Sequence, residues 1–224
     1  MIFENKNCIE GMKKLRSKSI DLIVADPPYL QSYESNHCKH KKFTQIINDD
    51  KGGEKVITEF IQESHRLLKD NSAIYIFCNA NKIDFFKTEI EKYFKIKNII
   101  VWVKNNWTAG DLKGAYAHQY EFLIYATKGR ALLNGKRLSD VWNFPRVVGK
   151  EQKHPNQKPL ALIKQILEKS SKEGDLILDP FAGVGTVAKA CSEMNRDNIS
   201  YEIDEKYYKI LLTMIKEYNK IESA

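Results

Sequence analysis

The tetrapeptide Asp26-Pro27-Pro28-Tyr29 is the first group of residues whose types could do chemistry together. It follows an apolar, β-branched run over residues 20–25, which predicts a buried parallel strand. Ligands of open α/β sheets bind at the carboxyl ends of such strands. The two prolines stiffen the loop and leave its backbone carbonyls free to accept hydrogen bonds. The turn thus holds a carboxylate, two carbonyl acceptors and an aromatic ring together, which would suit a planar substrate with an amino group. The alternative is that Pro-Pro only ends the strand and Tyr29 only packs.

The second group spans residues 179–186, with the sequence Asp-Pro-Phe-Ala-Gly-Val-Gly-Thr. Gly183 and Gly185 lie where a predicted strand turns into a helix, which lets a ligand approach the backbone. Glu202 ends the next predicted strand, about 20 residues on, where such folds place a carboxylate for ribose hydroxyls. Asp179 puts a negative charge beside the turn, which suits an ammonium group better than a pyrophosphate. A nucleoside with a cationic amino-acid tail fits, and S-adenosylmethionine has that chemistry.

A dinucleotide stays open on the glycines alone, because residue 188 is an alanine, which the dinucleotide fingerprint tolerates.

The composition is that of a globular protein, with 224 residues of which 42% are hydrophobic and 29% charged, and we expect one domain over residues 1–224. The net charge of +7 favours a polyanionic partner. Bases concentrate in residues 128–158, interleaved with aromatic residues as nucleic-acid surfaces often are. A solvated basic loop is the alternative. The candidate DNA-binding residues are Lys128, Arg130, Lys136, Arg137, Arg146 and Lys150.

The amino terminus lacks a secretory signal and no apolar run has membrane-spanning length, so we expect a cytoplasmic protein. The four cysteines are scattered and are interpreted as free thiols. Residues 31–53 form a long polar stretch, for which we expect a mobile loop near the active site. His37, Cys38 and His40 in this stretch lack a second ligand pair at a metal-site spacing, and we expect no metal.

Strands and helices alternate along the chain, which predicts a doubly wound α/β fold with a mostly parallel sheet. The expected strands cover residues 20–25, 73–78, 96–103, 119–127, 175–179 and 198–203. The expected helices cover residues 9–15 and 54–69, follow residues 79–81, begin near residues 159 and 186, and include residues 207–215.

With both groups assembled, the chain resembles the DNA amino-methyltransferases, which transfer a methyl group from S-adenosylmethionine to N6 of adenine or N4 of cytosine. The resemblance covers nearly the whole chain, because it also includes Val-Trp-Val-Lys-Asn at 101–105, Glu-Phe-Leu-Ile-Tyr-Ala-Thr-Lys at 121–128 and His-Pro-Asn-Gln-Lys-Pro at 154–159. The catalytic motif precedes the cofactor motif, an order similar to that of the permuted β group. The resemblance implies the methyltransferase (Rossmann-like) fold and a target-recognition insertion at 128–153.

The resemblance also implies roles for single residues. Asp26 and the Pro27 carbonyl would accept hydrogen bonds from the target amino group, with Pro28 in the same turn, and Tyr29 would stack on a flipped base. Lys158 would contact the methionine end of the cofactor, unless it is a solvated lysine at a helix start. The full set of implied cofactor residues is Asn7, Cys8, Asp26, His154, Lys158, Asp179, Phe181, Ala182, Gly183, Gly185, Thr186 and Glu202.

Two departures from the family pattern concern residues near the cofactor. The family often shows Gly-Asp-Cys where this chain has Lys6-Asn7-Cys8, so a contact to the adenine of the cofactor would be neutral. Asn156 replaces a frequent threonine.

Methylation of adenine N6 in double-stranded DNA is favoured, because the cytosine enzymes of this group more often carry serine at the position of Asp26. N4-cytosine methylation stays open, and more distant alternatives are methylation of RNA or of a protein glutamine, and a nucleic-acid-binding protein without catalysis. The resemblance leaves open a homodimer and a companion restriction endonuclease.

Overall fold

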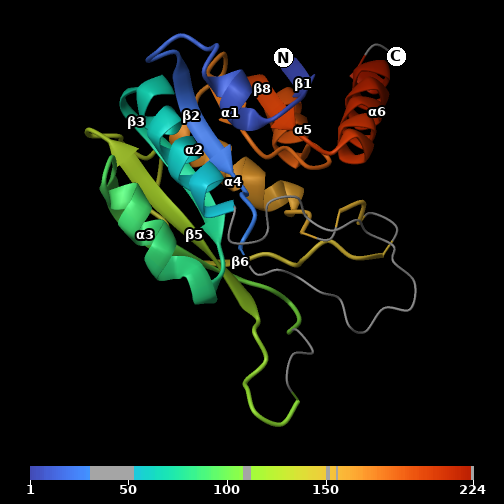
Figure 1. Ribbon diagram of the computed structural model, residues 1–224. Helices are drawn as coiled ribbons and strands as arrows, with labels where there is room; N and C mark the ends of the chain where they lie inside the picture. The colour runs from blue at the N-terminus through green and yellow to red at the C-terminus, as the bar shows by residue number, and fades with distance from the viewer. Residues whose placement is uncertain (31–52, 108–111, 150–151, 155, 223–224) are drawn as a thin grey trace.

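The computed structural model describes residues 1–30, 53–107, 112–149, 152–154 and 156–222. These residues form one sheet of eight strands in the order β1-β8-β7-β2-β3-β5-β4-β6, with helices on both faces (Figure 1). All neighbouring strands are parallel except for β5, which is antiparallel to β3 and to β4. The doubly wound, mostly parallel α/β fold is therefore confirmed.

The elements follow the predicted alternation closely. In the first half they are β1 (Ile2–Asn5), α1 (Cys8–Met12), β2 (Ile20–Ala25), α2 (Gly53–Leu67), β3 (Leu68–Cys78), η1 (Ala80–Lys82), α3 (Ile83–Glu91) and β4 (Lys95–Val103). In the second half they are β5 (Tyr120–Lys128), β6 (Val141–Asn143), α4 (Leu160–Ser170), β7 (Leu176–Asp179), α5 (Thr186–Glu193), β8 (Asp197–Glu202) and α6 (Glu205–Glu222). The short strands β1 and β6 were not predicted.

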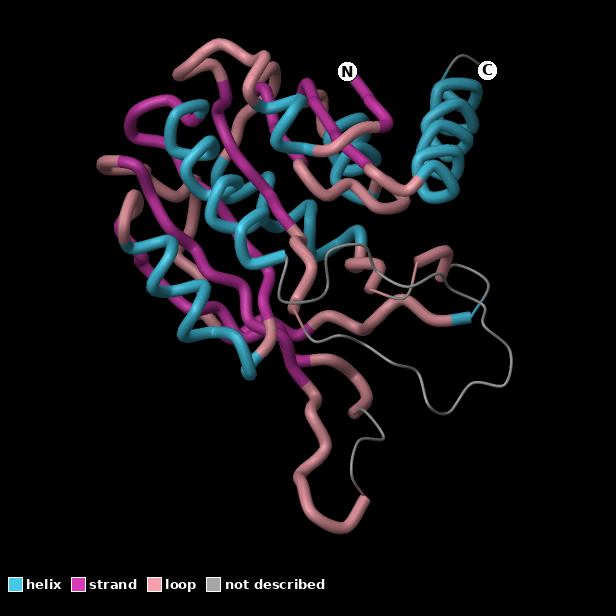
Figure 2. Tube along the Cα trace, in the orientation of Figure 1, coloured by secondary structure: helices cyan, strands magenta, loops and turns pink. Residues whose placement is uncertain are grey.

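The central strand β3 shows why the sheet needs two helical layers. Ile74 and Ile76 pack with α1, α2 and α3 on one face, while Tyr75 and Phe77 pack with α4 and α5 on the other. Because alternate residues of a strand point to opposite faces, an apolar residue at every position predicts burial on both sides. Figure 2 shows the helices on either side of the sheet, and α6 packs beside α5 through Leu211 and Ile215.

The direction of β5 decides which residues reach the ligand-binding edge. We call the edge at which the parallel strands end the carboxyl edge, and the opposite one the amino edge. Since β5 is antiparallel, it begins at the carboxyl edge with Tyr120 opposite Val103 and ends at the amino edge with Lys128 opposite Ser72 (Figure 1). Residues 129–140 therefore begin at the amino edge, and β6 then leads the chain back beside β4.

Two further findings bear on the sequence expectations. No described helix is both long and apolar enough to cross a membrane. The predicted loop of residues 31–53, with His37, Cys38 and His40, lies outside the described residues apart from Gly53, which begins α2.

Candidate active site

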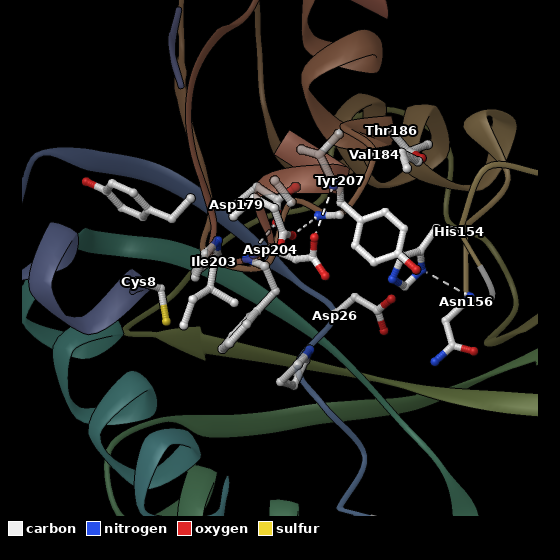
Figure 3. A pocket seen from close by; sticks show the side chains of 18 of the residues that line it. Cys8, Asp26, His154, Asn156, Asp179, Val184, Thr186, Ile203, Asp204 and Tyr207 are labelled. Carbon is white, nitrogen blue, oxygen red and sulfur yellow. Dashed lines mark hydrogen bonds between the residues drawn. The ribbon is translucent and has the colours of Figure 1, made fainter. Parts of the chain in front are cut away.

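A cleft of about 1130 Å³, its open mouth included, lies at the carboxyl edge. Its walls come from the segments that follow β1, β2, β7 and β8, and from the segment before α4 (Figure 3). The two sequence groups, at Asp26 and at Asp179, are thus brought together. The predicted residues that line the cleft are Asn7, Cys8, Asp26, Pro27, Pro28, His154, Lys158, Asp179, Phe181, Ala182, Gly183, Thr186 and Glu202.

Asp26 lies just after β2 and belongs to a compact group of charges. Its Oδ2 is 2.8 Å from Nζ of Lys158, and its Oδ1 accepts a hydrogen bond of 2.8 Å from the Tyr29 hydroxyl. Burial is the main cause that raises the pKa of Asp26; the charge of Lys158 opposes this rise and that of Glu121 adds to it. The side chain still reaches the cleft, because carboxylate oxygens have lone pairs beyond those used here.

Lys158 is not the solvated helix-start lysine of the alternative interpretation. Its side chain is only 5% exposed, and it donates to the Tyr29 hydroxyl at 2.9 Å besides pairing with Asp26. A buried ammonium needs such partners because desolvation alone would lower its pKa. The two carboxylates of Asp26 and Glu121 outweigh desolvation and raise the pKa of Lys158, so it stays protonated.

Glu121, the second residue of β5, completes this group and was not predicted as a site residue. Its Oε2 is 3.2 Å from Nζ of Lys158 and its Oε1 is 2.5 Å from Nζ of Lys104. Burial would raise the pKa of Glu121, but Lys158 and Lys104 outweigh burial and lower it to about 2. The signal for this residue was a lone acid at the start of an otherwise apolar strand.

Asp179 is a buried carboxylate on the other side of the cleft. It is 3% exposed, and its Oδ1 accepts a hydrogen bond of 3.2 Å from the Phe181 amide. Burial raises its pKa well above the ordinary value, and the charges of Asp26 and Glu202 add to the rise. Among the described residues Asp179 forms no ion pair, so a cationic group in the cleft would find an uncompensated carboxylate there.

The turn after β7 is held against the end of β8. Glu202 accepts a hydrogen bond of 2.6 Å from the Gly183 amide with Oε2 and one of 2.8 Å from the Asp204 amide with Oε1. Gly183 has φ +52°, and a Cβ there would meet no heavy atom within 4 Å. Its backbone is therefore open to a ligand, as the prediction required.

Gly185 has a structural role at the start of α5. Among the described residues it is not part of the cleft lining, and it adopts φ +86° as the N-cap residue of α5. A Cβ at this position would lie 2.8 Å from Cγ of Leu211 on α6. Its left-handed conformation and the close packing of α6 both favour a glycine, and its assignment as a cofactor residue stays a prediction.

His154 lines the cleft next to Tyr207 of α6. Tyr207 was not predicted as a site residue. The two rings form an edge-to-face contact with centroids 4.4 Å apart, as the labelled side chains in Figure 3 show. Burial, with a contribution from Lys158, lowers the pKa of His154 to about 4, so it is neutral at pH 7. Its Nδ1 accepts a hydrogen bond of 3.1 Å from the Asn156 amide. Asp204 also lines the cleft without having been predicted.

Near the start of the chain, Asn7 and Cys8 line the cleft between β1 and α1. The side chain of Asn7 accepts a hydrogen bond of 2.8 Å from the Ile9 amide and thereby caps α1. Burial raises the pKa of the Cys8 thiol to about 12, so it is a neutral contact residue rather than a nucleophile.

Four of the predicted DNA-binding residues lie at the amino edge of the sheet, away from the cleft. Lys128 ends β5 at the amino edge, where its Nζ donates to the carbonyls of His65 in the last turn of α2 and of Leu68 at the start of β3. Lys128 therefore caps a helix instead of facing a substrate.

Arg130, Lys136 and Arg137 follow Lys128 at the same edge. The Arg130 amide donates to Asn71, and the Lys136 carbonyl accepts a hydrogen bond of 2.6 Å from Lys169 at the end of α4. These three basic residues are thus held away from the cleft. Arg146 does lie at the carboxyl edge, where its amide donates to Asn105, and Lys150 is outside the described residues.

An open α/β sheet with this cleft, an acceptor-rich turn after β2 and a buried carboxylate at the end of β7, without an ion pair among the described residues, is the arrangement expected of an S-adenosylmethionine-dependent methyltransferase. The family model described as DNA methylase, of the N6/N4 type, matches residues 20–213. The chain therefore belongs to the N6/N4 DNA methylase family.

Individual relatives agree with this membership. The chain is 34% identical to the type II methyltransferase M2.MboI of Moraxella bovis, with 91% of this chain and 83% of the relative covered. It is 31% identical to the DNA adenine methyltransferase YhdJ of Escherichia coli K12, with 92% and 81% covered. Among solved structures, the M1.HpyAVI–SAM complex has a TM-score of 0.74 at 26% identity, covering 96% of this chain and 98% of that one.

Proposed function

We propose that this protein transfers a methyl group from S-adenosylmethionine to N6 of adenine in double-stranded DNA. The observation that carries the proposal is the position of Asp26, whose carboxylate reaches the same cleft as the buried, unpaired Asp179. One carboxylate is placed to accept hydrogen bonds from an amino group of the substrate, and the other is placed to pair with the ammonium group of the cofactor.

The cleft residues fit this cofactor. S-adenosylmethionine would supply an electrophilic methyl group on a sulfonium. Asp179 would pair with its ammonium group, and Glu202, with the open backbone at Gly183, would bind the ribose. Asn7 and Cys8 would contact the adenine as neutral groups, and Phe181 and the neutral His154 would form further contacts.

For methyl transfer, the turn after β2 has to orient the lone pair of the target nitrogen. Asp26 and the Pro27 carbonyl would each accept one hydrogen of the amino group, which directs the lone pair toward the methyl group. A strong general base is not required, because the nitrogen loses its proton readily once it is alkylated. Tyr29 is buried here with its hydroxyl bound to Asp26, so stacking on a flipped base requires its ring face to become exposed.

The choice of adenine is supported by Asp26 and by the relative named as a DNA adenine methyltransferase. A cytosine-N4-specific enzyme, PvuII, shares the fold with a TM-score of 0.75 but is only 12% identical. The test is transfer of a labelled methyl group to DNA, followed by digestion and nucleoside analysis. We expect N6-methyladenine, and N4-methylcytosine as the only product would overturn the choice of base.

The DNA is proposed to lie across the carboxyl edge, since the amino edge carries only residues far from Asp26. The described parts of the segment between β4 and β5, residues 104–107 and 112–119, project from this edge (Figures 1 and 2) and carry two exposed aromatic residues, Trp107 and Tyr116, the second of them fully exposed. Arg146 and the exposed Lys153 lie on the neighbouring segment. Aromatic residues among bases suit nucleic acid through stacking and phosphate contacts.

The matched comparison for this surface uses two double variants. Arg146→Ala with Lys153→Ala should weaken DNA binding about tenfold at low salt and reduce the slope of log Kd against log salt by about 2, because each lost phosphate contact removes about one counterion. Arg130→Ala with Lys136→Ala, at the amino edge, should leave both quantities unchanged. The reverse result would place the DNA at the amino edge.

Two partner assignments stay predictions. A homodimer would be detected by light scattering at working concentration. A companion restriction endonuclease would be detected as cleavage, by a neighbouring gene product, of the unmethylated form of the target sequence.

A further inference from the structure

Glu121 lies behind Lys158, one of the residues that line the cleft. Its side chain is 14% exposed and, among the described residues, it is not part of the cleft lining. It nevertheless contacts two residues of the catalytic group, since its Oε2 lies 3.2 Å from Nζ of Lys158 and 2.9 Å from the Tyr29 hydroxyl, whose single hydrogen is shared between Glu121 and Asp26.

The ammonium group of Lys158 is shared by two carboxylates. It lies 2.8 Å from Asp26 on the cleft side and 3.2 Å from Glu121 on the other, with the Tyr29 hydroxyl at 2.9 Å. Glu121 is itself paired with Lys104 at 2.5 Å. The four formal charges therefore alternate along a chain, in the order Lys104, Glu121, Lys158, Asp26, and sum to zero.

This arrangement matters for methyl transfer, because the target nitrogen gains positive charge before it loses its proton. A Lys158 paired with Asp26 alone would neutralise the carboxylate that has to accept a hydrogen from the amino group. Without Glu121 the group would also carry a net positive charge beside the developing cation, which is unfavourable at low local dielectric.

We propose that Glu121 is a positioning residue for methyl transfer, which shares the Lys158 ammonium group and the Tyr29 hydroxyl with Asp26, so that the Asp26 carboxylate is held in place without being fully neutralised and can still accept from the target amino group. The inference rests on the proposed function, because it assigns Asp26 the role of acceptor.

Glu121→Gln is the first variant to test, in single-turnover methyl transfer with saturating cofactor and DNA. We expect the rate to fall roughly 10- to 100-fold, as for a misplaced catalytic group, while the cofactor Kd changes by less than about threefold. Glu121→Asp, which keeps the charge, should recover part of the rate.

Lys104→Gln is the matched control, since it breaks the same Glu121–Lys104 ion pair but leaves Glu121 beside Lys158. We expect a smaller loss of rate than in Glu121→Gln, because Glu121 still contacts Lys158 and the Tyr29 hydroxyl. If Glu121→Gln does not fold, the double variant Glu121→Gln/Lys104→Gln removes the pair without leaving Lys104 unpaired. Because the remaining charges of Lys158 and Asp26 sum to zero, its loss of rate reports the positioning effect alone.

The pH profile separates positioning from a purely structural role. The charged and titratable groups facing Asp26 are Lys158 before α4, Glu121 on β5, Tyr29 in its own loop and Asp179 on β7. Because the charge of Glu121 raises the pKa of Asp26, Glu121→Gln should move the acidic limb of the kcat/KM profile to lower pH even though the rate is reduced.

Several outcomes would overturn the inference: an unchanged rate and acidic limb in Glu121→Gln, or an equal loss in Lys104→Gln. If the wild type itself transfers no methyl group to DNA, the proposed function fails instead, so the two failures are distinguishable.

Discussion

Nζ of Lys158 lies 2.8 Å from Oδ2 of Asp26, which joins the segment before α4 to the turn after β2. This ion pair connects two motifs that are far apart in the sequence, and both of its residues line the cleft. The motif around Lys158 therefore serves the catalytic turn as well as the cofactor side of the cleft.

Replacing Asp26 by alanine should abolish methyl transfer while cofactor binding is largely kept. The target amino group would lose its main acceptor, and we expect a loss of rate of at least about 100-fold. The rate is measured with labelled cofactor, and cofactor affinity by calorimetry on the same preparation. A cofactor Kd that rises in parallel with the loss of rate would contradict this division of roles.

Lys158→Met should destabilise the protein, because it leaves the carboxylates of Asp26 and Glu121 without their shared cation. Breaking a buried ion pair costs about 3 kcal/mol or more in free energy of unfolding, measured by urea denaturation. Lys164→Met removes a more exposed ion pair to Glu193 and should change the free energy of unfolding by less than about 1 kcal/mol. Equal effects of the two substitutions would argue against a buried charge group.

Asp179→Asn should stabilise the free protein and weaken cofactor binding. Burial raises the folded-state pKa of Asp179 above its unfolded value of about 3.9, so between these two pKa values the folded state binds more protons than the unfolded state. The free energy of unfolding therefore falls as pH rises from the unfolded-state pKa to the folded-state pKa. The variant removes this loss, so its melting temperature should exceed that of the wild type at pH 7 and depend less on pH. Its cofactor Kd should rise about tenfold or more, and an unchanged Kd would exclude Asp179 as the ammonium partner.

The two glycines of the turn after β7 should respond differently to alanine. Gly185→Ala combines a left-handed φ with a Cβ 2.8 Å from Leu211, and should lower the free energy of unfolding by about 3 kcal/mol. Gly183→Ala has open space around its Cβ and should cost only the backbone strain of about 1 kcal/mol, but place a methyl group in the cleft. Chemical denaturation and cofactor titration of both variants check this, and a larger loss of cofactor affinity in Gly185→Ala would contradict it.

The fold was largely predictable because the pattern of β2 and β3 is unambiguous. An apolar residue at nearly every position over residues 20–25 and 73–78 fits only strands covered on both faces, and the motifs at Asp26 and Asp179 both follow such strands. The strands β1 and β6 were missed because they are short and half exposed, so they carry little hydrophobic signal.

Site residues were predicted where a sequence motif lies at the carboxyl end of a parallel strand. They were missed where the edge of the sheet that a residue reaches depends on the direction of its strand. Counting bases selected Lys128 and Arg130, but charge does not tell which edge of the sheet a residue reaches. The same reversal of β5 brings Glu121 to the carboxyl edge, and no local pattern distinguishes an antiparallel strand in this sheet. Tyr207 contacts the cleft only because α6 returns beside it, which is a long-range feature.

The antiparallel course of β5 also separates the two segments on which this chain could vary independently. The segment between β4 and β5 leaves and re-enters at the carboxyl edge, so a change in its length would alter what meets the substrate. The segment between β5 and β6 begins at the opposite end of the molecule, and insertions there would leave the catalytic charges undisturbed. An engineer who wished to attach a reporter or a tethering domain would therefore choose the exposed residues Arg137 and Leu138, whereas one who wished to change target preference would graft at Trp107 to Tyr116.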